Sequence, residues 1–129
     1  MEKYFVTYEQ ALALKELGFN KKCFNLFDKN GSLMYKPNGN IVMIKIDNHN
    51  KTNFCSAPLK IQVFEWFREK HFLTAFVETD FGDEFYSKIE EIRHPRTLSL
   101  NEKRIIAFSK TYEEAESVCI DKLIELITK

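Results

Sequence analysis

The sequence predicts an α+β fold in which one antiparallel sheet of five or six strands packs against three helices. Two observations support this fold class. Threonine residues that can cap helices precede two helical apolar patterns, and β-prone runs are separated by short segments rich in glycine, asparagine and aspartate. In chain order the segments are helix, three strands, helix, three strands, helix, or α-βββ-α-βββ-α.

The first helix is expected to begin after Thr7 and to end at Gly18. Gln10 lies three residues after Thr7, the spacing at which each side chain can accept a hydrogen bond from the other residue's backbone N–H. Gly18 is a residue type that commonly terminates a helix, because it adopts a left-handed backbone conformation without strain.

Three β-prone runs are expected after this helix, and together they predict a three-stranded meander. Both segments between them contain Asn-Gly, a dipeptide that favours tight reversals. In the last run, Val42, Ile44 and Ile46 share one face, as the period of a strand requires. The runs lie near 23–28, 32–36 and 41–46, and the turn segments are 28–31 and 37–40.

The second helix is expected from Ser56, as its N-cap, to about Lys70, with Pro58 in the first turn. Its apolar residues occupy one broad face, which we expect to be buried. Ile61 and Phe72 fall outside that face, so either the helix is covered from a second side or these residues contact a partner. We interpret them as covered. The apolar face comprises Leu59, Val63, Phe64, Trp66 and Phe67.

The second block of strands is expected near 73–80, 84–92 and 103–109, with 81–83 as the first turn. Thr111 then caps the last helix, and Glu114 completes the same capping pattern as in the first helix. The apolar face of this last helix comprises Ala115, Val118, Cys119, Leu123, Leu126 and Ile127.

A short repeat links the two capping sites. The segment Thr7-Tyr8-Glu9-Gln10-Ala11 recurs as Thr111-Tyr112-Glu113-Glu114-Ala115, each time after a β-prone stretch. We interpret the repeat as one good helix-capping signal used twice. A duplicated ligand-binding corner is the alternative.

Composition favours a single domain spanning residues 1–129, with 44% hydrophobic residues available for a core. The 19 basic residues balance the 19 acidic ones, so no overall field attracts the chain to nucleic acid or an anionic membrane. No apolar run approaches the ~20 residues of a membrane span. The start of the chain has no signal-peptide pattern, and the cysteines lack metal or redox spacing. We therefore expect a cytoplasmic protein that carries no metal and no cofactor.

Three segments of the chain resemble a known set of sequences. They are Tyr4–Phe19 (YFVTYEQALALKELGF), Ala57–Lys70 (APLKIQVFEWFREK) and Thr111–Glu125. In this order they resemble small proteins of tailed phages and prophages of gut bacteria, whose β-rich middle varies. The resemblance implies a phage setting in the cytosol of a bacterial host. It implies no catalytic residue.

A cationic stretch is the candidate anion-binding site. Guanidinium groups can hold phosphate or carboxylate in a bidentate manner, so the ligand would be a nucleotide, a nucleic-acid backbone or an acidic protein surface. The structural alternative is a solvated connection between strands. The residues of this candidate site are Arg93, His94, Arg96, Lys103 and Arg104.

Aromatic and acidic residues on the expected strands form a candidate partner surface. Leu73, Ala75 and Val77 supply one strand face, so Phe76 is expected on the other. Such aromatic residues are buried in the core or in a homodimer, anchor a protein partner, or stack on bases. The acidic residues offer a recognition surface, plain solvation or a hard-cation site. The candidate residues are Tyr35, Phe76, Glu78, Asp80 and Tyr86.

Catalytic signatures are absent from the sequence. There is no Gly-x-Ser-x-Gly segment or phosphate-binding glycine loop, and Cys55 is expected as a small buried group without a positioned base. We therefore predict a non-enzymatic accessory protein that binds a host or phage macromolecule, with a protein as the expected partner and nucleic acid not expected. The alternative is a binder of a small anionic ligand such as a nucleotide, and the third reading is a small enzyme.

Overall fold

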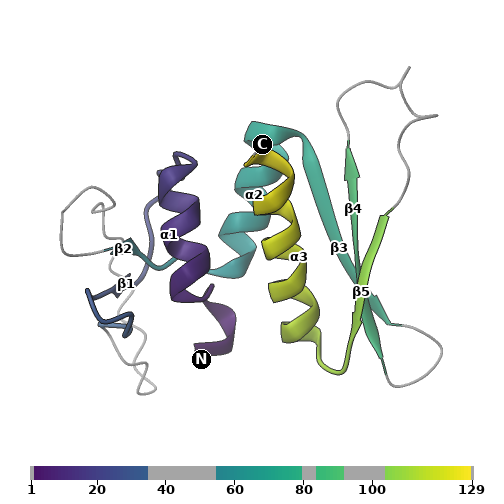
Figure 1. The fold of residues 1–129 in the computed structure, drawn as a ribbon, viewed down its shortest axis with the longest axis horizontal. Helices are drawn as coiled ribbons and strands as arrows, with labels where there is room; N and C mark the ends of the chain where they lie inside the picture. Colours follow the sequence, from purple (N-terminus) through teal and green to yellow (C-terminus); the bar gives the residue numbers. More distant parts are fainter. Residues whose placement is uncertain (1, 35–54, 80–83, 92–103, 129) are drawn as a thin grey trace. The chain divides into compact units, whose positions relative to one another are not determined.

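The computed structural model describes residues 2–34, 55–79, 84–91 and 104–128 (Figure 1). These residues form an α+β fold with three α-helices and two antiparallel sheets, one of two strands and one of three. The predicted fold class is confirmed, but the prediction of one sheet of five or six strands is wrong. The chain divides into two compact units, Met1–Gln62 and Val63–Lys129, with the division inside the second α-helix.

In the first unit, a short 3-10 helix η1 (Glu2–Tyr4) precedes α1 (Tyr8–Glu16). The predicted capping box is confirmed: Thr7 Oγ1 accepts from the Gln10 N–H at 3.2 Å, and Gln10 Oε1 accepts from the Thr7 N–H at 2.9 Å. Gly18 follows the helix with φ +93°, a conformation that glycine adopts without strain.

The two-stranded sheet pairs β1 (Leu26–Phe27) with β2 (Cys55–Ser56). Pro58 closely follows β2, and since proline has no N–H, it does not extend the ladder as a donor. Its carbonyl oxygen instead accepts from the Val6 N–H at 3.1 Å. Phe5 also bridges Leu59, so the N-terminal segment pairs with the residues that follow β2.

The turn predicted after the first β-prone run is present. Asp28 Oδ1 accepts hydrogen bonds from the N–H groups of Asn30 and Ser32, at 2.8 and 3.0 Å. The Asp28 N–H donates to the Ser32 carbonyl, and Phe27 bridges Leu33, so the chain reverses as predicted. The strands themselves are shorter than predicted: of the run near 23–28 only Leu26–Phe27 form a strand, and the described residues of the run near 32–36 contribute a single bridge. The run at 41–46 and the second turn lie outside the described residues.

Helix α2 spans Lys60–His71, so the prediction of Ser56 as its N-cap is wrong. Ser56 pairs with Leu26 in β2, and Gln62 Oε1 accepts from the Leu59 N–H at the true helix start. Of the predicted apolar face, Val63, Trp66 and Phe67 are buried. Phe64 is half-buried, and Leu59 lies just before the helix.

Cover of α2 from a second side is a prediction that the structure contradicts. Ile61 is 72% exposed and Phe72 is also exposed. The helix buries the broad face that the wheel predicts and leaves these two side chains outside it.

The second unit contains the three-stranded antiparallel sheet, in the order β3 (Leu73–Thr79), β4 (Phe85–Glu91) and β5 (Arg104–Ser109). All three strands confirm the predicted runs to within one or two residues. The register of β4 on β5 shifts between Ser87 and Lys88, which introduces a bulge. The predicted turn at 81–83 lies outside the described residues.

Helix α3 (Tyr112–Ile127) lies along one face of this sheet and contacts all three strands (Figure 1). Thr111 caps it as predicted, with Oγ1 accepting from the Glu114 N–H at 3.1 Å. The prediction that Glu114 completes the reciprocal pattern is wrong, because the Glu114 side chain does not accept from the Thr111 N–H. The buried face of α3 comprises Ala115, Cys119, Ile120 and Leu123. Within the described parts of the chain, none of the helices combines the length and apolar character needed to cross a membrane.

Candidate functional site on the outer face of the sheet

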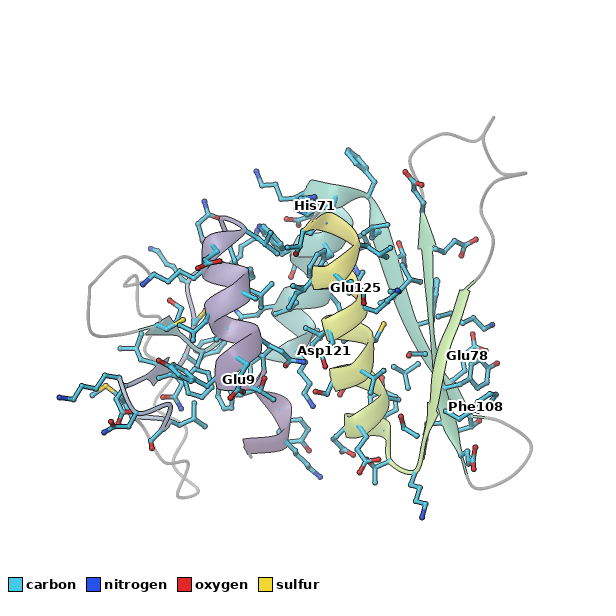
Figure 2. All side chains as sticks on the ribbon, in the orientation of Figure 1. Glu9, His71, Glu78, Phe108, Asp121 and Glu125 are labelled. Atoms are coloured by element: carbon cyan, nitrogen blue, oxygen red, sulfur yellow. The ribbon has the colours of Figure 1, made fainter. Side chains whose placement is uncertain are left out.

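The face of the three-stranded sheet opposite α3 carries the candidate site. Strand side chains alternate between faces, and Ser87 and Ile89 of β4 are buried on the α3 side. Their neighbours along β4 therefore lie on the other side. Glu78 and Phe108 project away from α3 (Figure 2). We call this surface the outer face, and it comprises Phe76, Glu78, Tyr86, Lys88, Glu90 and Phe108.

A polar network occupies the middle of the outer face. Glu78 lies directly opposite Tyr86 in the strand register, and Glu78 Oε2 accepts a hydrogen bond from the Tyr86 hydroxyl at 2.7 Å. The same oxygen accepts from Lys88 Nζ at 3.2 Å. The Lys88 ammonium also lies 5.3 Å from the centre of the Tyr86 ring, within the range of a cation–π contact. One carboxylate oxygen therefore accepts hydrogen bonds from two side chains.

The network changes the proton affinities of its members. The hydrogen bond to Glu78 raises the pKa of Tyr86, because ionised tyrosine would face a carboxylate. The hydrogen bond to Glu78 is also the main cause that raises the pKa of Lys88. Both side chains therefore keep their protons throughout the physiological range.

Two exposed phenylalanines flank the network. Phe76 is 40% exposed on β3 and Phe108 is 54% exposed on β5. Phe108 lies opposite Tyr86 in the strand register, with the two ring centres 5.8 Å apart. Exposed aromatic side chains on a rigid strand are the residue type that anchors protein interfaces.

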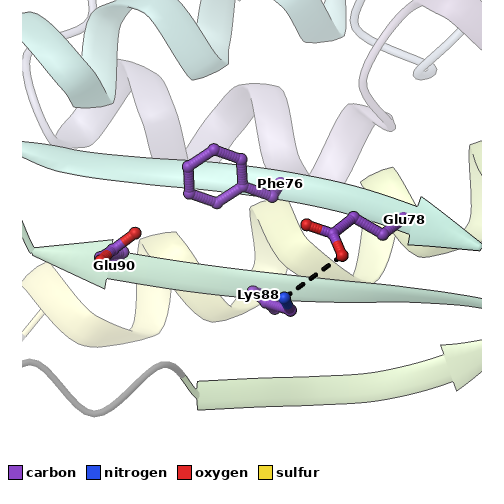
Figure 3. A pocket seen from close by; sticks show the side chains of 4 residues that line it. All are labelled: Phe76, Glu78, Lys88 and Glu90. Atoms are coloured by element: carbon purple, nitrogen blue, oxygen red, sulfur yellow. Dashed lines mark hydrogen bonds and ion pairs between the residues drawn. The ribbon is translucent and has the colours of Figure 1, made fainter.

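A pocket of about 130 Å³ lies on this surface and is lined by Phe76, Glu78, Lys88 and Glu90 (Figure 3). Phe76 on β3 and Lys88 on β4 are cross-strand partners, so the Phe76 ring and the Lys88 side chain lie next to each other. The pocket combines one aromatic wall, two carboxylates and one ammonium group.

The structure brings together three of the five residues predicted as a partner surface: Phe76, Glu78 and Tyr86. Tyr35 and Asp80 lie outside the described residues. Sequence reasoning missed Lys88, Glu90 and Phe108. Lys88 and Glu90 could have been predicted from the alternation of β4, because every second residue of a strand lies on the same face and Tyr86, Lys88 and Glu90 are such residues. The addition of Phe108 required the register of β5, which pairs it with Tyr86.

The candidate anion-binding site falls almost wholly outside the described residues. Of its members, Arg93, His94, Arg96 and Lys103 lie outside them, and the backbone of Arg104 begins β5 opposite Ile89. Among the described residues, no group of three or more His, Cys, Asp or Glu side chains is placed to hold a metal ion.

The cysteines are buried rather than poised for chemistry. Burial raises the pKa of Cys23 and of Cys119 to about 12, and it also raises the pKa of Cys55. A nucleophilic cysteine needs the opposite shift, because the thiolate is the reactive form. Cys55 is buried as expected, and it lies in β2 against Phe27 in the strand register.

Comparison of the chain with family models, with curated proteins and with solved structures finds no match.

Proposed function

We propose that this chain is a non-enzymatic binding protein whose outer face contacts a protein partner. The observation that carries the proposal is the pair of exposed phenylalanines, Phe76 and Phe108, on either side of the ordered Glu78–Tyr86–Lys88 network. Aromatic anchors beside a positioned polar group are the typical composition of an interface centre.

The rigidity of the outer face supports the proposal. Its side chains rise from three hydrogen-bonded strands, and α3 packs on the opposite side of the sheet. Side chains held in this way lose little conformational freedom on association, so more of the contact energy remains as affinity. The polar network makes binding specific, because a partner must match one carboxylate, one ammonium and one hydroxyl in their observed positions.

The setting of this function is part of the proposal. The resemblance of Tyr4–Phe19, Ala57–Lys70 and Thr111–Glu125 to small phage and prophage proteins supports a role in the cytosol of an infected bacterium. The partner would then be a host or phage protein. The balanced charge of the chain supports a protein partner over nucleic acid.

The test compares matched surface variants as affinity baits in extracts of phage-infected bacteria. Phe76→Thr/Phe108→Thr removes both anchors and keeps β-branched residues on the strands. Leu12→Thr/Ile61→Thr is the control, since both side chains are exposed and both lie in helices of the first unit. Circular dichroism melts establish that each variant is folded.

A protein retained by the wild type and by the control, but lost from the outer-face variant by at least about tenfold, supports the proposal. That loss corresponds to about 1.4 kcal/mol, which is modest for two interface anchors. Retention of the same proteins by all three baits would overturn it.

A further inference from the structure

The pocket on the outer face has an excess of negative charge. Glu78 and Glu90 contribute two carboxylates and Lys88 contributes one ammonium group. The ammonium is already engaged by Glu78 Oε2 at 3.2 Å and by the Tyr86 ring. Within the described part of the chain, the Glu90 carboxylate has no hydrogen-bond or ion-pair partner.

The excess negative charge favours a cationic group in the pocket, and the aromatic wall adds a second requirement. Phe76 is 40% exposed, and its ring lines the pocket beside the carboxylates (Figure 3). A phenylalanine ring attracts cations through its electron-rich face, and flat cations also stack on it. A guanidinium satisfies both requirements, since it stacks on rings and donates two parallel hydrogen bonds to a carboxylate.

The geometry points to this pocket as the receptor for an arginine side chain of the protein partner, with the guanidinium between Phe76 and Glu90. This inference rests on the proposed function and names the chemistry of its partner. An anionic occupant would meet two carboxylates, and its attraction to Lys88 would compete with Glu78. An uncharged apolar occupant would bury Glu90 without a partner, which is costly.

Protein rather than a free small molecule is the source of the guanidinium. The pocket is small and open, so it encloses the end of one side chain and gives little affinity alone. Phe108, on the far side of the Tyr86 ring, adds contact area that only a larger partner reaches. The partner segment therefore presents arginine together with apolar groups.

The test uses two capped tripeptides, acetyl-Gly-Arg-Gly-amide and the same peptide with citrulline, which keeps the shape of arginine but is neutral. Binding is followed by chemical-shift changes in the backbone amides of β3 and β4. We expect saturable shifts at Phe76 and Glu90 with the arginine peptide, and an affinity at least about fivefold lower for citrulline. A rise of ionic strength weakens only the arginine peptide.

Two glutamine variants complete the test. Glu90→Gln is expected to lower the affinity for the arginine peptide about fivefold, to the level of citrulline. Glu91→Gln removes the same charge from the next residue of β4, which alternation places on the α3 side of the sheet, and it leaves the affinity unchanged. Equal effects of the two variants, equal binding of the two peptides, or no saturable shift at β3 and β4 would each overturn the inference.

The outcome is distinguishable from that of the proposed function. If the Phe76→Thr/Phe108→Thr variant loses a partner protein that Glu90→Gln still retains at full strength, the outer face is an interface but the pocket does not receive an arginine. Sedimentation of the wild type as a dimer that Glu90→Gln dissociates would make a second copy the occupant, and would overturn the inference in the form stated.

Discussion

The ring of Tyr8 lies directly against Gly31, so that a Cβ atom on residue 31 would stand 2.8 Å from Cδ2 of Tyr8. The ring is held in that position by Phe27, with the two ring centres 5.5 Å apart in an edge-to-face arrangement. Gly31 also has φ +82°, a conformation that side chains rarely adopt. The Asp28–Ser32 turn is therefore closed against the first residue of α1.

Replacement of Gly31 by alanine is expected to lower the free energy of unfolding by roughly 2 to 4 kcal/mol, because the backbone strain and the contact with Tyr8 add together. Gly18→Ala is the matched control. Its φ is +93°, but no atom lies within 4 Å of the added Cβ, so only the strain of about 1 kcal/mol applies. Urea denaturation followed by fluorescence of Trp66 measures both losses. Equal losses would show that Tyr8 moves aside without cost.

The junction between α2 and β3 contains a second strained position. Phe72 has φ +56°, directly after the last residue of α2, where glycine is the usual residue. We expect Phe72→Gly to be more stable than Phe72→Ala by about 1 kcal/mol, the reverse of the order in a helix or strand interior. The two variants delete the same ring contacts, so their difference in chemical denaturation isolates the backbone. A more stable alanine variant would contradict this assignment of strain.

The strands of the second unit could be predicted from sequence because each has a clear local pattern. In β3, the half-buried Ala75 and Val77 alternate with the exposed Phe76 and Glu78, so the two faces follow directly from the sequence. Helices α1 and α3 also follow from local signals, since Thr7 and Thr111 form the caps that their sequences predict.

The first unit was less predictable because its sheet depends on pairing between distant residues. Leu26 pairs with Ser56, and no local signal in either run indicates the other. Ser56 and Pro58 match a helix start, yet tertiary pairing takes Ser56 into β2 and moves the start of α2 to Lys60. Local propensity is a weak guide where a long-range pair competes with it.

The candidate site, too, was predictable from local patterns only in part. Strand alternation predicts that Phe76 and Glu78 share a face, but only the register places Tyr86 and Lys88 within reach of Glu78 Oε2. The approach of two donors to one carboxylate oxygen is a property of three-dimensional structure. Sequence therefore predicts which residues face outward, and the fold decides which of them interact.

The two threonine caps are expected to differ in their contribution to stability. Thr7 belongs to a reciprocal capping box, whereas for Thr111 the structure has one capping bond, from the Glu114 N–H. We expect Thr7→Ala to lower the free energy of unfolding by about 1 to 2 kcal/mol and Thr111→Ala by about 1 kcal/mol. Thr→Ser at each position keeps the accepting oxygen and is expected to restore most of the loss, as measured by urea midpoints. A failure of serine to restore either cap would mean that the threonine methyl group, rather than the hydroxyl, provides the stability.

The buried thiols predict how stability depends on pH in alkaline solution. Burial raises the pKa of Cys23 and of Cys119 to about 12 from an ordinary value of 9.0. In the unfolded chain these thiols lose their protons near the ordinary value, while the folded chain keeps them. The unfolded state then binds fewer protons, so the free energy of unfolding falls between about pH 9 and pH 12, and below that window the full stability is present. Each thiol contributes a slope of about 1.4 kcal/mol per pH unit.

Removal of one thiol is expected to make the free energy of unfolding fall less steeply with pH in alkaline solution. The reduction is about half of the slope that Cys23 and Cys119 contribute together. Cys119→Ala lowers stability at neutral pH through the cavity it leaves beside Ser87, but it abolishes the difference in proton binding that the Cys119 thiol contributes. Ile120→Val is the matched control on α3, because it also perturbs a fully buried side chain and leaves both thiols in place. Urea midpoints at pH 7.5, 9.0 and 10.5 separate the loss of packing from the loss of the thiol. The midpoints of the isoleucine variant are expected to be lower by the same amount at each pH, whereas those of the cysteine variant fall less with pH than those of the wild type. Parallel lines for both variants would show that the Cys119 thiol ionises as easily in the folded protein as in the unfolded chain, and would contradict the prediction.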